Sequence, residues 1–148
     1  MGSLAETFRP GSRYQAFFGS LATFGLAYGL YKGVLDNYLA EIVEMSEMGR
    51  GVSEFFRELP GLALVFLLAA FYMMSAERIY KMGAMIMLMG MVLHAVIPAH
   101  KVLATAAICV YSLGEHLQLG MRNTLSLEYA RPGWGGTALG LQNSIYQI

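Results

Sequence analysis

Long apolar segments constrain the fold of this chain more than any other feature of its sequence. Four of them cover residues 16–43, 52–74, 82–97 and 102–121, and a fifth begins at residue 137 and continues to residue 148. A helix of roughly 20 residues crosses the hydrocarbon core of a bilayer, which is about 30 Å thick. The pattern therefore predicts an all-α, polytopic transmembrane helical bundle with four full spans and the start of a fifth. Because nothing polar closes the last segment, we expect a fragment of a longer protein.

Composition supports a lipid environment and excludes several classes of protein. Of 148 residues, 56% are hydrophobic and only 14% are charged, whereas an average soluble domain has about 25% charged residues. The net charge is zero and no basic patch is present, which argues against a nucleic-acid partner. The single cysteine, Cys109, can form neither a disulfide framework nor a thiolate metal site. We expect it to pack among apolar side chains, and we predict neither a metal nor a cofactor.

The N-terminal tail and the basic residues predict how the chain lies in the membrane. Residues 1–15 are polar for too long to be the start of a signal peptide, so the apolar segment that follows is expected to stay in the protein as the first span of a transmembrane bundle formed by residues 16–148. Lys and Arg accumulate at the cytoplasmic ends of spans. Six would lie on the side of the N-terminus: Arg9, Arg13, Arg78, Lys81, Arg122 and Arg131. Three would lie opposite: Arg50, Arg57 and Lys101. This bias favours insertion in the cell membrane with the N-terminus inside.

The first span carries a glycine stripe and two charges. Gly25, Gly29 and Gly33 recur every four residues, a spacing that lets another helix backbone approach closely. Lys32 and Asp36 point within about 60° of this stripe, so both are expected to face the interior of the bundle, where they are also spaced to pair with each other. Two readings remain open: an interfacial ion-pair cluster, or part of a substrate or proton path.

Ionisable residues recur in the second and fourth spans. Arg57 and Glu58 are expected at a depth similar to that of Lys32 and Asp36, and they allow the same two readings. Glu115 and His116 are adjacent and point about 100° apart, so they cannot bind one metal as a pair of residues four apart does. They represent either a protonatable group facing a cavity or a polar pair bonded to neighbouring helices.

The third span is rich in methionine, which we interpret as adaptable packing. Its methionines are distributed around the helix: Met82, Met85, Met87, Met89 and Met91. No metal cluster, nucleophile motif or catalytic carboxylate pair accompanies them in the sequence, and we therefore do not expect an enzyme.

Three stretches resemble the major facilitator superfamily of transporters. The sequence MMSAERIYKM, residues 73–82, resembles the G-x-L-a-D-R-x-G-R-R motif between the second and third spans of that family. Glu77 matches its acidic position, and Arg78 and Lys81 match basic positions, whereas both glycine positions are replaced. Residues 37–69 resemble the first outer loop and second span of the family, with a kink near Pro60-Gly61, and residues 128–147 resemble the connector into its fifth span.

The resemblance implies the N-terminal half of a twelve-span secondary transporter, which moves a small solute by alternating access between two similar halves. In such a protein Glu77, Arg78 and Lys81 belong to the cytoplasmic gate, with Arg122 as partner of Glu77. Residues of the first, second and fourth spans are expected along the substrate or proton pathway. These are Tyr28, Tyr31, Lys32, Asp36, Asn37, Arg57, Glu58, Glu115, His116 and Gln118. Asp36 or Glu115 could carry a coupled proton. The expected partners are the bilayer, a small solute and the missing C-terminal half of the chain.

Two other readings fit the same pattern. A four-span carrier of the small multidrug type, active as a dimer, would explain the length of the chain but not the fifth apolar segment. A membrane assembly subunit without transport activity is the second, and the interior charges argue against it.

Overall fold

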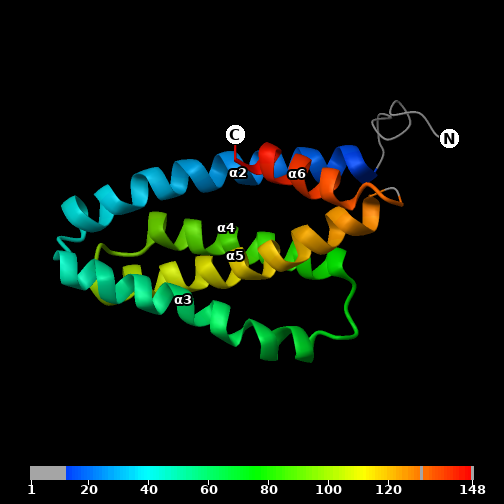
Figure 1. Cartoon of the computed structure of the whole chain (residues 1–148). Coiled ribbons are helices and arrows are strands. Elements are labelled where there is room, and N and C mark those ends of the chain that lie inside the picture. The colour runs from blue at the N-terminus through cyan, green and yellow to red at the C-terminus, as the bar shows by residue number, and fades with distance from the viewer. Residues whose placement is uncertain (1–12, 131, 148) are drawn as a thin grey trace. The chain divides into compact units, whose positions relative to one another are not determined.

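A computed structural model describes residues 13–130 and 132–147, and this part of the chain is all-α. Its elements are α2 (Arg13–Asn37), the short π-helix η1 (Tyr38–Ile42), α3 (Glu47–Ala70), α4 (Ala76–Val96), α5 (Lys101–Tyr129) and α6 (Gly135–Tyr146) (Figure 1). Residues 1–12 of the predicted cytoplasmic tail, which was expected over residues 1–15, lie outside the described residues. Arg9 and Arg131, which were used to predict the orientation, also lie outside them.

Every apolar segment of the sequence is largely helical, but the helices do not begin and end where the apolar stretches do. The third begins at Ala76 rather than at residue 82, and the fourth continues to Tyr129 rather than ending at residue 121. Charged residues such as Glu77 and Arg122 end a hydrophobic stretch without ending a helix, because both are reasonable helix formers. Hydropathy therefore located the helices but not their ends.

Two of the described helices, α4 and α5, are long and apolar enough to cross a membrane. Helix α3 has five charged residues in its first half, and these reduce its mean hydropathy: Glu47, Arg50, Glu54, Arg57 and Glu58. The all-α prediction is confirmed. Length and composition support two spans instead of the four that the sequence predicted.

Local side-chain interactions fix the beginnings of α3 and α4. Ser46 caps α3 by accepting a hydrogen bond from the backbone N–H of Gly49 at 3.2 Å, and Ser75 caps α4 by accepting one from Arg78 at 3.4 Å. Serine is favoured at this position because its hydroxyl replaces the missing intrahelical acceptor. Between η1 and α3, Glu44 has a φ of 54°, which is uncommon for a residue other than glycine. The chain thus turns at Glu44, and Ser46 begins the next helix.

The described helices form two compact units. The first contains α2 as far as Gly33 together with α6 and the end of α5 from Ser126. Its aromatic rings pack in pairs, with 5.6 Å between the ring centroids of Phe17 and Tyr129. The Ser126 hydroxyl donates a buried hydrogen bond of 2.7 Å to the side-chain carbonyl of Gln142.

The second unit, residues 34–125, contains α3, α4 and most of α5. Helix α5 supplies more of its buried apolar side chains than any other helix, namely Ala104, Ala107, Ile108, Tyr111, Leu117 and Leu125. Glycines bring α4 and α5 into backbone contact. A Cβ atom on Gly90 would lie 2.6 Å from the backbone of Tyr111, and one on Gly114 would lie 2.5 Å from the backbone of Gly83. Only glycine permits such an approach, which increases dispersion contacts between the helices.

This finding changes the interpretation of the glycines. Of the stripe predicted in the first span, Gly25 meets the backbone of Tyr146, but no described atom lies within 4 Å of the position of a Cβ on Gly29 or Gly33. In the second unit it is Gly83 and Gly90 of α4 that lie closest to the backbone of the neighbouring helix α5. These are seven residues apart, and therefore on one face of α4.

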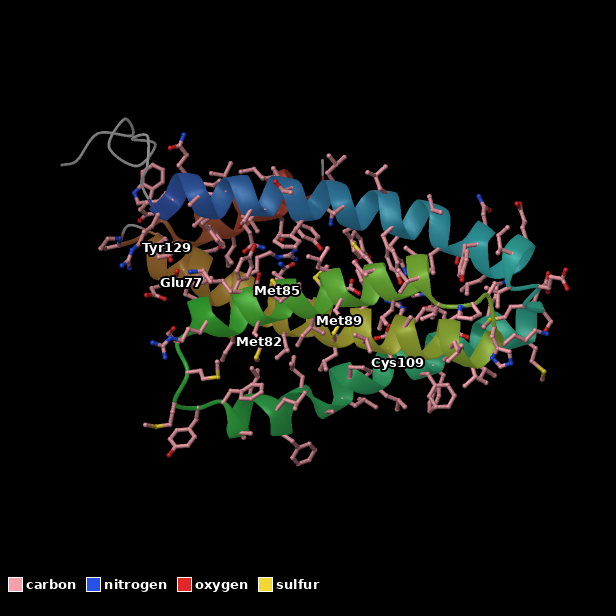
Figure 2. All side chains as sticks on the ribbon, turned by 180° about the vertical axis from the view of Figure 1, so that it is seen from behind. Glu77, Met82, Met85, Met89, Cys109 and Tyr129 are labelled. Atoms are coloured by element: carbon pink, nitrogen blue, oxygen red, sulfur yellow. The ribbon has the colours of Figure 1, made fainter. Side chains whose placement is uncertain are left out.

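Much of the helical surface is apolar. On α3, Leu62, Val65 and Phe66 are each more than 70% exposed, and Met85 on α4 is 67% exposed. Figure 2 shows Met82, Met85 and Met89 along α4, while Met87, at 1% exposed, is buried. The methionines therefore occupy different faces, as predicted. A continuous exposed apolar surface is typical of contact with lipid or with another protein.

We predict that Gly114→Ala destabilises the chain by about 1–3 kcal/mol, because the new methyl group must separate α4 from α5. The measurement is the free energy of unfolding in detergent micelles. Gly29→Ala is the matched control, since its methyl group meets no described atom, and it should leave stability unchanged or raise it by up to about 1 kcal/mol. Equal effects of the two substitutions would contradict the close packing of α4 and α5.

Candidate functional site

A cluster of charged side chains joins α3 to α5 within the second unit, and Arg57 is its centre. The Arg57 guanidinium contacts three carboxylates: Glu54 Oε2 at 2.6 Å, Glu58 Oε1 at 2.7 Å and Glu115 Oε2 at 3.8 Å. Glu54 and Glu58 come from the same helix as Arg57, whereas Glu115 comes from α5. One cation thus faces three anions, and only the pairing with Glu115 links two helices.

The two partners of the interhelical pair are the least exposed members of the cluster. The side chains of Arg57 and Glu115 are 19% and 17% exposed, while those of Glu54 and Glu58 are 45% and 56% exposed. Charges that leave water need both pairing and hydrogen bonds. Glu115 therefore depends on Arg57 more than the other two carboxylates do.

Proline explains why polar groups of α5 meet the backbone of α3 at this point. Pro60 has no N–H, so the carbonyl of Phe56 loses its usual intrahelical donor. The Cys109 thiol contacts this carbonyl at 3.4 Å, and the Ser112 hydroxyl donates to the adjacent carbonyl of Arg57 at 2.5 Å. In apolar surroundings such side chains on a neighbouring helix satisfy backbone groups that proline frees.

The next residue of α3, Gly61, leaves room for the imidazole of His116. A Cβ on Gly61 would lie 2.6 Å from His116 Nε2. The other ring nitrogen, Nδ1, lies 2.9 Å from the carbonyl of Ser112 and 3.1 Å from its hydroxyl oxygen. The missing side chain at Gly61 and the hydrogen bonds that Nδ1 makes to Ser112 together position the ring.

These hydrogen bonds identify the tautomer of His116. Because the Ser112 hydroxyl donates its hydrogen to Arg57, both oxygens near Nδ1 act as acceptors, and Nδ1 must carry the ring proton. In the neutral ring Nε2 then carries a lone pair and no hydrogen, and it lies 3.7 Å from Glu58 Oε2. The unprotonated ring nitrogen therefore faces a carboxylate oxygen. Around Arg57 the carboxylates outnumber the cation by three to one.

The structure brings together four of the predicted pathway residues, namely Arg57, Glu58, Glu115 and His116. The predicted residues of α2 are placed differently. Tyr28 packs against Tyr146 with ring centroids 5.8 Å apart. Tyr31 and Lys32 are half-buried, whereas Asp36 and Asn37 are exposed.

The expected pairing of Lys32 with Asp36 does not form. Within residues 13–130 and 132–147 neither side chain makes an ion pair with the other or with a third residue. Spacing of four residues permits such a pair, but an exposed pair contributes only about 0–1 kcal/mol.

Gln118, also predicted on the pathway, is buried against α4. It is 2% exposed, its backbone N lies 3.0 Å from the position of a Cβ on Gly83, and its Nε2 has no hydrogen-bond partner among the described residues. A buried amide without a partner is uncommon in folded proteins.

The predicted gate residues lie near the beginning of α4 and the end of α5. Lys81 Nζ donates to Glu77 Oε1 at 2.6 Å on the surface, and Arg78 is exposed. Arg122 is 7% exposed. Since α4 and α5 are antiparallel and Gly83 faces Gln118, Glu77 and Arg122 occupy the same end of this helix pair. The specific pairing of Glu77 with Arg122 stays a prediction.

Four polar residues of the α3–α5 contact were not predicted: Ser53, Glu54, Thr105 and Ser112. A signal for two of them was present, because Glu54 precedes Arg57 by three residues and Ser112 precedes His116 by four, spacings that place each pair on one helix face. Ser53, which bonds Thr105 across the helices at 2.8 Å, has no comparable signal. Its partner lies 52 residues away in the sequence.

Comparison with protein-family models, with curated proteins and with solved structures yields no match. Within the described ranges no group of three or more His, Cys, Asp or Glu side chains is arranged to hold a metal ion. The geometry of the α3–α5 cluster therefore carries the functional argument alone.

We predict that neutral His116 carries its ring proton on Nδ1. The chain contains three histidines, so ¹⁵N spectra of histidine-labelled protein, assigned with His116→Gln, can resolve the tautomer directly. The expected result is a protonated Nδ1 and an unprotonated Nε2. A ring with its proton on Nε2 would contradict the donor role of Ser112 and the acceptor pair formed with Glu58.

Proposed function

We propose that this chain is part of a secondary active transporter that moves a small solute across a membrane by alternating access, with proton coupling at the α3–α5 cluster. The observation that carries this proposal is the group of Arg57, Glu58, Glu115 and His116 on a molecule whose surface is otherwise largely apolar. Ionisable side chains are expensive in a membrane, and where they occur they mark pathways for ions, protons or polar substrates.

The excess of carboxylates supports the assignment of a proton. With His116 neutral, Arg57 balances only one of its three carboxylate neighbours. A proton taken up by His116 or Glu58 relieves both the excess charge and the contact between two acceptors. A proton on Glu58, or on His116 beside it, weakens the competition of Glu58 for Arg57. It therefore strengthens the attraction of Arg57 to Glu115, an ion pair between the two helices. Proton uptake is thereby coupled to the contact of α3 with α5.

The resemblance to the major facilitator superfamily supplies the wider frame of the proposal. In this frame Glu77, Arg78, Lys81 and Arg122 belong to a cytoplasmic gate, and α2, α3, α4 and α5 are spans of one bundle. A second bundle, supplied by the rest of the protein, would complete the central cavity. The apolar surfaces of α3 and α4 would then face lipid or that second bundle.

Thiol accessibility tests this proposal without knowledge of the substrate. Cys109 is the only cysteine, so a Cys109→Ala background allows single cysteines to be introduced. We expect Glu58→Cys, in the complete gene product, to react with the charged reagent MTSET in right-side-out and in inside-out membrane vesicles, because an alternating site meets water from each side in turn. Phe66→Cys and Met85→Cys are the controls, and both should be unreactive because a charged reagent does not reach an apolar surface covered by lipid or by the second bundle.

Each other result has a definite meaning. Reaction at position 58 from one side only would favour a membrane assembly subunit without transport activity. No reaction from either side would show that the cluster does not meet water. Rapid reaction of the controls would place α3 and α4 outside the hydrocarbon core.

A further inference from the structure

An open pocket of about 650 Å³ lies between the first half of α3 and the first half of α5, both in the second unit. Sites that bind a small molecule or one segment of a larger one have volumes of about 300–1,000 Å³. The walls of this pocket are mainly apolar, with side chains that include Met48, Val52, Phe56, Val102 and Cys109. Its size and lining suit a hydrocarbon chain.

The polar groups of the pocket are already bonded to each other. Ser53 and Thr105 share a hydrogen bond of 2.8 Å across the two helices, and Ser46 accepts the capping bond from Gly49. These groups therefore contribute little to the binding of a polar ligand. Lys101 is the only charged residue of the lining, and among the residues that the structure describes it forms no ion pair.

We propose that this pocket binds an anionic phospholipid, with one acyl chain between α3 and α5 and the phosphate at Lys101. Two features lead to this assignment: the positive charge of Lys101 at one end of the pocket, and the apolar walls along the rest of it. The Lys101 ammonium lies at the first residue of α5, where the helix dipole also favours an anion. The apolar walls extend from there along α5 to Cys109, a distance of about 12 Å at 1.5 Å per residue.

A second copy of the chain fits this pocket less well than a lipid does. Docking of an exposed apolar face, such as that of Leu62, Val65 and Phe66 on α3, would bury Lys101 without a counter-charge, which is unfavourable. A phospholipid provides an apolar segment and an anion in one molecule. The inference rests on the proposed membrane location but not on transport, so it can fail while the accessibility result at position 58 stands, and the reverse also holds.

Native mass spectrometry of the detergent-purified chain tests this site. We expect one retained dioleoyl phosphatidylglycerol, bound more tightly than dioleoyl phosphatidylcholine. Lys101→Gln should reduce the affinity for phosphatidylglycerol about fivefold, as expected for about 1 kcal/mol per lysine near an anionic lipid. Arg50→Gln is the matched control, because Arg50 is a cation near the start of α3 that does not line the pocket, and it should not change the affinity. Equal affinities of the two lipids, or equal effects of the two substitutions, would overturn the proposal.

Cys109 provides a second readout that does not depend on a substitution. It is the only cysteine and it lines the pocket, so bound phosphatidylglycerol should slow its alkylation by N-ethylmaleimide, whereas phosphatidylcholine at the same concentration should slow it less. Ala106→Trp should fill the pocket and abolish lipid retention, with folding checked by circular dichroism. An alkylation rate independent of the lipid would contradict the proposed occupant. Protection of Cys109 in a lipid-free dimer would show that a second copy occupies the pocket instead.

Discussion

The pairing of Arg57 with Glu115 is the interaction on which the arrangement of α3 and α5 depends most. Both side chains are less than 20% exposed, and they join two helices that also contact each other through hydrogen bonds. Removal of Arg57 would take this cation away from a poorly solvated carboxylate, which is less favourable than the loss of an exposed pair. The pair of Glu77 and Lys81, with side chains 44% and 70% exposed, lacks this dependence.

Backbone chemistry supports the same contact and explains why it forms at this level of the helices. Pro60 frees a carbonyl of α3, and Cys109 and Ser112 lie on the face of α5 that meets this part of the backbone. Gly61 then leaves the space that His116 occupies. On the opposite side, α5 contacts α4 through Gly83, Gly90 and Gly114. Helix α5 thus lies between a polar contact and a close backbone contact, and it carries the residues that we assign to proton uptake.

The sequence predicted the described helices α2 to α6, because each contains a long apolar stretch, and helices satisfy their own backbone hydrogen bonds in an apolar environment. It also selected Arg57, Glu58, Glu115 and His116, since ionisable residues within such stretches need a specific reason. Their mutual contact could not be predicted, because it depends on the rotation of α3 against α5. The same limit explains the glycines: the spacing of Gly25, Gly29 and Gly33 permits close packing, but only the position of a neighbouring helix decides where close packing occurs. Lys32 and Asp36 show that a favourable spacing does not by itself produce an ion pair.

A double-mutant cycle between Arg57 and Glu115 tests the central claim most directly. The free energies of unfolding of Arg57→Met, Glu115→Gln and the double variant would be measured against the unsubstituted chain in detergent micelles. If the pair links α3 to α5, Glu115→Gln should restore part of the stability that Arg57→Met removes, with a coupling free energy of about 1 kcal/mol or more. Additivity of the two substitutions within about 0.3 kcal/mol would show that the side chains act independently, and would contradict the account.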